Sequence, residues 1–559
     1  MDFRALVDEL FADYFRLQPV SATELGTHTH DSEWPDLTDA GRATWRDWTS
    51  AAAERVRAVD AHGLSRDDVI DRRILLESLD AMRFFAADLR EEEWNPLGYV
   101  YLLGDGLFGL LSREFAPLPD RLRSAAARMR GMPGVLAAAR AALQSDGVRE
   151  VSRFHAEKAV ERIRGIDDLV ATALEEGERH GDPTLLRELE SAAAEARAAL
   201  DAYTTWLRDE LLPTAHGDFR LGPELYAAKF HHALKTEFTP ATLQARARAE
   251  YDEVRAEMTR IARSIWGTWM GDATPPADDN AAVRAVLDAI GADHPGAEEL
   301  LDYCRAEVAR IEAFVAGKDL VGLAEEPLQI VWTPQFLRSI GGAMLIPPGP
   351  LDRGLDSFFS ITPMPATWSD ERKESYLREN NARMLRVLSI HEAVPGHYLQ
   401  LAYSNRTSSL VRAVFRSGVF AEGWAVYVTQ VMMDVSYGAD DPALMLVHWK
   451  MYLRAITNTL MDIAIHTGSM DRDEAMQLMV KGGFQEEGEA VAKWDRARLS
   501  STQLCEYFLG GVEMQGLEGE ARRRAAAEGR EFIYRPFLES VLAHGTPSLP
   551  VIREILFGA

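Results

Sequence analysis

The stretch from His391 to His397 constrains the local fold more strongly than any other part of the chain. It reads His-Glu-Ala-Val-Pro-Gly-His and places its two histidines six residues apart. At about 100° per residue, a regular α-helix would turn these side chains about 240° apart and aim them to different sides. Pro395 removes a backbone donor and clashes with the preceding turn, and Gly396 tolerates unusual backbone angles. We therefore expect the helix to break or bulge between His391 and His397.

The residue types of this stretch indicate metal chemistry. In zinc hydrolases an H-E-x-x-H helix supplies two metal ligands and a general base, and here the same residue types occur with two more residues between the histidines. Glu392 stands among apolar residues, and a buried carboxylate costs several kcal/mol unless a partner such as a metal or its bound water compensates it. The alternative is that His391 and Glu392 make ordinary buried hydrogen bonds beside a kink. The presence of His397 argues against that alternative.

Glu422 is the candidate for a third ligand. It is the only charged residue between positions 417 and 433, and its neighbours are apolar on nearly every helical face, so this helix is expected to be buried. Two histidines and one glutamate with an open position match a catalytic zinc site, although Mn, Co and Fe accept the same ligand types. The alternative is an ion pair between Glu422 and an arginine such as Arg412 or Arg454.

Four further residues are weaker candidates. Asp462 and His466 are four residues apart on a predicted helix and share one face, where they could orient a metal ligand or present a proton donor. Tyr507 could donate a hydrogen bond to an oxyanion, and Arg498 could bind a substrate carboxylate. Each also has a structural alternative: a hydrogen bond within the helix, half-buried packing, or a solvated charge.

The pattern of apolar residues predicts a mainly α-helical fold. In residues 1–215 apolar side chains recur every three or four positions, which is typical of amphipathic helices, and helical patterns resume after residues 222–226. Three short β-prone runs, at 328–332, 343–346 and 357–361, predict a small antiparallel sheet of two or three strands beside the helix that carries His391. The predicted regions are therefore 1–215 and 216–559, which could also form one continuous domain.

Charge and cysteine content exclude some classes of function. A formal net charge of -26 repels nucleic-acid phosphates and anionic membrane surfaces, so neither is an expected partner. The chain contains only Cys304 and Cys505, which rules out a zinc site made mainly of cysteines and favours a reducing compartment. The acidic start and the lack of a run of about 18 apolar residues predict a cytoplasmic protein.

The chain resembles the bacterial family of unknown function DUF885, whose members are regarded as zinc metallopeptidases of the broad gluzincin type. The resemblance rests on I-H-E-A-V-P-G-H-Y-L-Q at 390–400 and E-G-W-A-V-Y at 422–427, and it spans nearly the whole length. It implies His391, His397 and Glu422 as metal ligands, Glu392 as general base and acid, and a mostly helical, zincin-like fold in which N-terminal helices cover a cleft. The chain departs from the family at Tyr398, where many members have a second histidine, and at 501–503, where Ser-Thr-Gln replaces Pro-Gly-Gln.

These observations predict a zinc-dependent hydrolase that cleaves peptide bonds in short peptides. Glu392 would act as general base, and Tyr507 or His466 would stabilise the oxyanion. A metal-dependent hydrolase of a non-peptide amide is the second hypothesis. The third hypothesis is a helical binding protein without catalysis. It gives no role to Glu392, since a binding protein needs no general base beside the two histidines.

Overall fold

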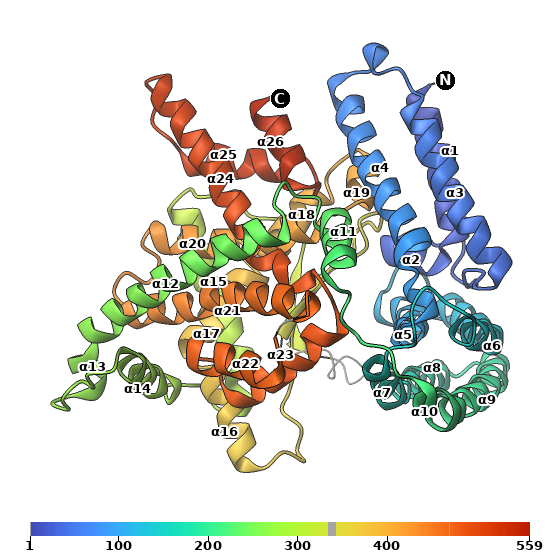
Figure 1. Cartoon of the computed structure of the whole chain (residues 1–559), viewed down its shortest axis with the longest axis horizontal. Helices are drawn as coiled ribbons and strands as arrows, with labels where there is room; N and C mark the ends of the chain where they lie inside the picture. The colour runs from blue at the N-terminus through green and yellow to red at the C-terminus, as the bar shows by residue number, and fades with distance from the viewer. Residues whose placement is uncertain (1, 334–342, 469, 559) are drawn as a thin grey trace. The chain divides into compact units, whose positions relative to one another are not determined.

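The structure is a computed structural model that describes residues 2–333, 343–468 and 470–558 (Figure 1). The chain divides into two compact units. Unit 1 comprises Met1–Leu221, Pro348–Leu355 and Ser409–Phe415, and unit 2 comprises Gly222–Pro347, Asp356–Ser408 and Arg416–Ala559. The predicted boundary after residue 215 lies close to the end of the first segment of unit 1. The two later segments of unit 1 have no counterpart in the sequence pattern, because only tertiary contacts assign them to it.

Unit 1 is helical, as the spacing of its apolar residues predicts. Helices α6 and α9 pack against each other, and α8 packs against both. Gly181 ends α8 in the left-handed conformation and Pro183 begins α9, so the predicted break lies where expected. The helices are α1 (Phe3–Leu17), α2 (Pro19–Leu25), α3 (Asp39–Arg57), α4 (Arg66–Phe84), α5 (Leu97–Ser112), α6 (Leu118–Leu143), α7 (Arg153–Arg162), α8 (Gly165–His180), α9 (Pro183–Trp206), α10 (Leu212–Thr214) and α19 (Leu410–Val414).

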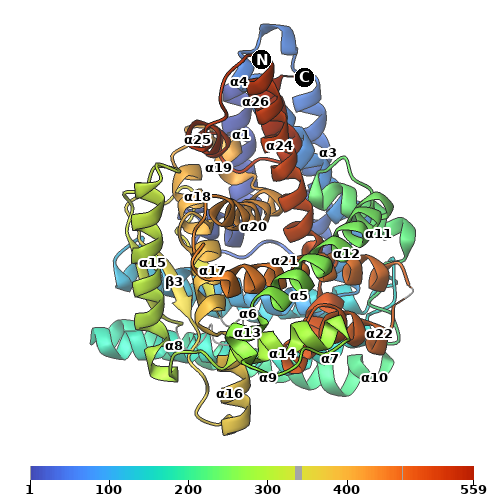
Figure 2. The ribbon, with the colours of Figure 1, turned by 90° about the vertical axis from the view of Figure 1, so that its left-hand side faces the viewer.

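Unit 2 contains the remaining helices and a small sheet. Helix α12 packs against α21, and α20 packs against α24 (Figures 1 and 2). The helices are α11 (Pro223–Leu234), α12 (Pro240–Ser264), α13 (Trp266–Met270), α14 (Asp279–Gly291), α15 (Leu300–Gly317), α16 (Asp370–Glu379), α17 (Ala382–Glu392), α18 (His397–Ser404), α20 (Gly418–Asp434), α21 (Pro442–His466), α22 (Arg472–Met476), α23 (Glu487–Leu499), α24 (Glu506–Ala527), α25 (Tyr534–Leu542) and α26 (Leu549–Phe557).

The sheet consists of β1 (Leu328–Trp332), β2 (Ala343–Ile346) and β3 (Ser357–Ile361), which confirms the three predicted strands. The prediction that the sheet is antiparallel is wrong. The strand order is β1-β3-β2, with β3 parallel to β1 and antiparallel to β2. Local β-propensity identifies a strand but carries no information on its partner. Helix α15 packs against both β1 and α17, and so connects the sheet to the helix that carries His391.

Helices α20 and α24 cross with their backbones in contact at Gly423 and Gly510. A Cβ atom on Gly510 would lie 2.1 Å from the carbonyl oxygen of Val419 and 2.5 Å from the Cα of Gly423. No larger residue fits at this crossing without moving one of the helices. The contact places the first turn of α24 next to the turn of α20 that contains Glu422.

We expect Gly510→Ala to destabilise the protein by about 1–3 kcal/mol, because the added methyl group overpacks the crossing. Gly516 lies on the same helix, and a Cβ atom there would meet nothing within 4 Å. As the matched control, Gly516→Ala should be neutral or slightly stabilising, since alanine favours helix more than glycine does. Urea denaturation followed by tryptophan fluorescence measures both variants. Equal midpoints for the two would contradict the close crossing.

Candidate metal centre

The helix that carries His391 ends before His397, as the sequence predicts. Helix α17 begins after Asn381, whose side chain caps it by accepting hydrogen bonds from two backbone amides, and ends at Glu392. Ala393 leaves helical geometry with φ -103° and ψ -96°, and the Val394–Pro395 peptide bond is cis. A new helix, α18, begins at His397. The two histidines therefore belong to different helices. The rotation of about 240° that a single regular helix would impose between them does not apply.

Close packing determines the shape of the loop between α17 and α18. A Cβ atom on Gly396 would lie 1.9 Å from the carbonyl oxygen of His391 and 2.3 Å from that of Ile390, so the chain folds back against the end of α17. The buried indole of Trp424 donates a hydrogen bond of 2.8 Å to the carbonyl oxygen of Pro395. Trp424 lies two residues after Glu422, so α20 supports the loop and supplies the third side chain of the site.

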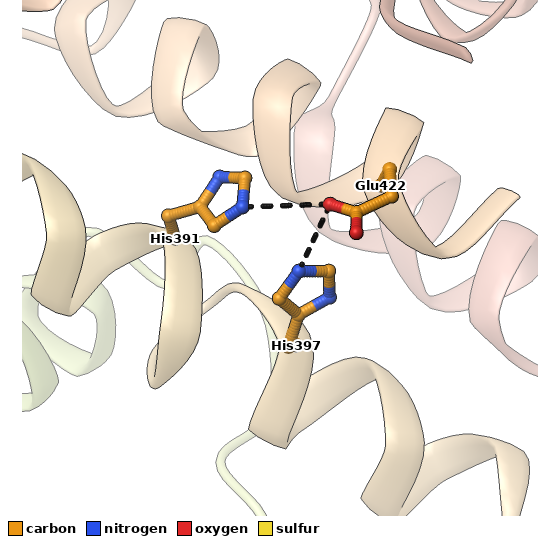
Figure 3. A group of neighbouring side chains, drawn as sticks. All are labelled: His391, His397 and Glu422. Carbon is orange, nitrogen blue, oxygen red and sulfur yellow. Dashed lines mark ion pairs between the residues drawn. The ribbon is translucent and has the colours of Figure 1, made fainter. Parts of the chain in front are cut away.

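His391, His397 and Glu422 converge on one point (Figure 3). The Nε2 atoms of His391 and His397 lie 3.7 Å and 3.4 Å from the same carboxylate oxygen of Glu422. The two rings are nearly perpendicular, with centroids 4.8 Å apart. Ligands that bind zinc tetrahedrally at about 2.0–2.2 Å are themselves roughly 3.3–3.6 Å apart. The three side chains therefore have the donor types and the spacing of a three-ligand metal site.

The charges of the triad are strongly coupled. Burial alone would raise the pKa of Glu422, but its contacts with His391 and His397 lower that pKa below its usual range. Burial alone would lower the pKa of His397, but Glu422, with a smaller contribution from Glu392, raises it. Glu422 is thus a carboxylate at neutral pH, the form that binds a cation. Glu392 is half-buried, directly precedes the break, and lies close enough to influence His397.

The alternative partners proposed for Glu422 are engaged elsewhere. Arg412 pairs with Asp71 and Asp67, at 2.6 Å and 3.1 Å. Arg454 pairs with Glu489 and lies 3.8 Å from Glu379. Both guanidinium groups thus have carboxylate partners of their own, which leaves the two histidines as the ion-pair partners of Glu422 in the described part of the chain.

Tyr507 belongs to the same electrostatic environment as the triad. Burial raises the pKa of Tyr507 to about 12, and the negative charge of Glu422 adds to this effect. The phenol therefore keeps its proton at neutral pH and can donate a hydrogen bond. Its hydroxyl accepts a bond of 3.1 Å from Arg496, which also donates to Gln503 at 2.9 Å. Arg498, the predicted substrate-binding residue, instead forms an ion pair with Asp495 and lies over the ring of Trp494.

Asp462 and His466 hold the connection between α23 and α24. Asp462 accepts hydrogen bonds from the Tyr226 hydroxyl at 2.6 Å and from the Thr502 amide at 2.9 Å. The Nε2 atom of His466 lies 2.8 Å from the carbonyl oxygens of both Ala497 and Ser500. These contacts position the segment that leads to Tyr507 and involve neither histidine of the triad. They give Asp462 and His466 a supporting role for the start of α24.

Three residues near the triad were not predicted from the sequence. Arg496 contacts Tyr507, while Lys493 and Glu506 are influenced by the charge of Glu422. Burial raises the pKa of Glu506 to about 8, and Glu422 contributes to the rise, so this carboxyl group is largely protonated at neutral pH. The sequence does not show toward which neighbour a charged side chain on a helix points. Only the packing of α23 and α24 shows these three as neighbours of the site.

Comparison with known proteins places the chain in a family. The model of the family described as "Bacterial protein of unknown function (DUF885)" matches residues 19–556. The chain belongs to this family. No curated protein matches it. The matched range includes 390–400 and 422–427, the two segments that supply His391, His397 and Glu422.

Two solved structures share the DUF885 fold of this chain. A putative lipoprotein of unknown function from Shewanella oneidensis is 30% identical, with a TM-score of 0.85 and coverage of 100% of both chains. A putative lipoprotein from Colwellia psychrerythraea is 16% identical, with a TM-score of 0.80 over 98% of this chain and 97% of that one, and shows the fold alone. Among the helices described here, none has the length and apolar character needed to cross a bilayer. The cytoplasmic location stays a prediction.

Proposed function

We propose that this protein is a metal-dependent hydrolase of the gluzincin type that cleaves peptide bonds in short peptides. The observation that carries the proposal is the convergence of His391, His397 and Glu422. One carboxylate oxygen of Glu422 lies 3.7 Å from the Nε2 atom of His391 and 3.4 Å from that of His397. Two imidazoles and one carboxylate leave a position open for water or substrate, which is the arrangement of catalytic rather than structural zinc. Zinc is the proposed metal.

The side chains of the triad are better placed to bind a metal ion than to form hydrogen bonds with one another. A single carboxylate oxygen of Glu422 faces both imidazoles, and it has no hydrogen-bond donor among the described residues. The Glu422 side chain as a whole is 21% exposed, but the oxygen that faces the imidazoles is itself buried. A divalent ion bound here would polarise a substrate carbonyl and lower the pKa of a bound water.

The chain supplies the remaining functions from its own side chains. Glu392, next to His391 at the end of α17, is the group that takes a proton from the attacking water and returns it to the leaving amine. Tyr507, protonated at neutral pH, is the donor that stabilises the negative charge on the carbonyl oxygen in the transition state. Arg496 holds the Tyr507 hydroxyl through the 3.1 Å hydrogen bond and so positions it.

Metal removal tests the proposal. Protein purified without chelators should contain about one divalent ion per chain, and o-phenanthroline should abolish peptide hydrolysis because the water loses its activating ion. Stoichiometric Zn²⁺ should restore activity, and parallel additions of Mn²⁺ and Co²⁺ identify the preferred ion. Absence of a bound metal would favour a binding protein without catalysis.

The substrate class is tested separately, with the metal-loaded protein. Dipeptides, longer peptides and non-peptide acyl amides are incubated in parallel, and products are identified by mass spectrometry. We expect cleavage of short peptides. Cleavage of acyl amides together with inactivity on every peptide would replace the peptide substrate with a non-peptide amide.

A further inference from the structure

We infer that Lys493 and Arg496 form a subsite for a carboxylate that the substrate brings to the metal centre. This inference rests on the proposed function and specifies its substrate class: peptides with a free C-terminal carboxylate, or with an acidic side chain, next to the scissile bond.

Both cations lie on one face of α23. They are three residues apart, a spacing that places side chains side by side on a helix. Arg498, two residues beyond Arg496, is turned about 200° away on the same helix. That rotation agrees with the separate contacts of Arg498, which pairs with Asp495, whereas Arg496 contacts Tyr507.

Lys493 is the last residue of an ion-pair network that contains more cations than carboxylates. Lys450 pairs with Glu379 at 2.8 Å, and Arg454 lies between Glu379 and Glu489. Glu489 is 4.0 Å from the Lys493 ammonium, at the limit of an ion pair, and is already held by Arg454. Within the described chain, three cations therefore share two carboxylates in this network. Lys493, whose side chain is only 10% exposed, has the longest carboxylate contact of the three cations.

A buried ammonium without a full partner is costly and favours binding of an anion. Burial, together with the positive charges of Arg454 and Arg496, lowers the pKa of Lys493 to about 7, while Glu489 and Glu422 oppose this shift. A substrate carboxylate would offset this burial and stabilise the charged form. Arg496 is exposed and offers donors that a carboxylate can share with the Tyr507 hydroxyl.

The subsite adjoins the helices that carry Tyr507 and Glu422. Arg496 donates a hydrogen bond of 3.1 Å to the hydroxyl of Tyr507, in the first turn of α24. One turn further along, Gly510 of α24 meets Gly423 of α20, the residue after Glu422. A carboxylate held by Lys493 and Arg496 is therefore placed close to the bond under attack, as required for the terminal residue of a short peptide. In a protein with a net charge of -26, this local positive site is also what would attract an acidic group.

Three peptides blocked at the N-terminus distinguish the source of the carboxylate; the first two share one sequence without acidic side chains, and the third differs from them by one residue. The first has a free C-terminal acid, the second a C-terminal amide, and the third a C-terminal amide with an acidic side chain after the scissile bond. We expect kcat/KM to be about tenfold or more higher for the free acid than for the plain amide, the value of one charge-assisted hydrogen bond. Equal rates for the acid and the third peptide would assign the subsite to acidic side chains as well.

Lys493→Met should raise KM for the free acid about tenfold, with a smaller effect on kcat and little effect on the amide. Lys493→Arg should restore most of the loss because it keeps the charge. Arg496→Gln changes an exposed residue that also holds the Tyr507 hydroxyl, so it should lower kcat on both peptides but raise KM about tenfold for the free acid alone, even if the lysine variant folds poorly. Lys481→Met, at an exposed position of the same unit, is the matched control. Equal rises in KM for the acid and amide peptides would overturn the inference.

Binding separates this inference from the proposed function. Calorimetric titration of the free acid and the amide into Glu392→Gln protein requires no turnover. The subsite would be supported if the acid binds more tightly than the amide and if adding Lys493→Met to this protein abolishes the difference. This result would count even if the wild-type protein cleaves no peptide. Equal binding of acid and amide, or no binding of either, would contradict it.

Discussion

Glu392→Gln should lower kcat for peptide hydrolysis by about 10²–10⁴-fold while the protein keeps its metal. The amide has the size of the carboxylate but cannot accept the proton of the attacking water. The ligand set of His391, His397 and Glu422 is unchanged, so metal content should equal that of the wild type. Steady-state kinetics and metal analysis by mass spectrometry measure the two quantities on the same preparation.

Glu371→Gln is the control for this experiment, because Glu371 is exposed in the first turn of α16. It should leave kcat and metal content unchanged. Full activity of Glu392→Gln would exclude Glu392 as the general base. Loss of the metal in that variant would instead indicate that Glu392 is a ligand.

Gly396→Ala should reduce both stability and metal affinity. The added methyl group would start 1.9 Å from the carbonyl oxygen of His391, so the loop must move away from the end of α17. Overpacking of this kind costs about 1–3 kcal/mol or more, and displacement of a ligand's support typically weakens metal binding about 10–100-fold. Thermal unfolding and a competitive zinc titration measure the two effects.

Gly317→Ala, at the last residue of α15, is the matched control, since a Cβ atom there meets nothing within 4 Å. It should leave metal affinity unchanged. Wild-type zinc affinity in Gly396→Ala would show that the close approach of residue 396 to α17 is not needed to bring His397 to the site.

Several features of the site follow from local chemistry and could be predicted from the sequence. Pro395 and Gly396 fix the end of α17 through steric effects within a few residues, so the helix break needs no distant contact. Glu422 is conspicuous as the one charge in an otherwise apolar helix. The three strands follow from short β-prone runs between prolines and glycines. The DUF885 family follows from the same motifs.

Other features depend on contacts between residues far apart in the chain. The insertion of β3 between β1 and β2 makes the sheet mixed, and strand propensity does not encode pairing. Arg498 and Arg496 have the same charge and occur on the same helix, yet only Arg496 meets Tyr507. The packing of α23 decides between them, because two residues on a helix correspond to about 200° of rotation.

The sequence by itself determined the His391–His397 motif, its break and the isolated Glu422, because each depends on residue type and on sterics over one or two turns. The tertiary structure alone decided that Glu422 meets both histidines, through the packing of α20 against α17 and α18. It also decided that Lys493 meets only a carboxylate that Arg454 already holds, since ion pairing is a property of neighbours in space.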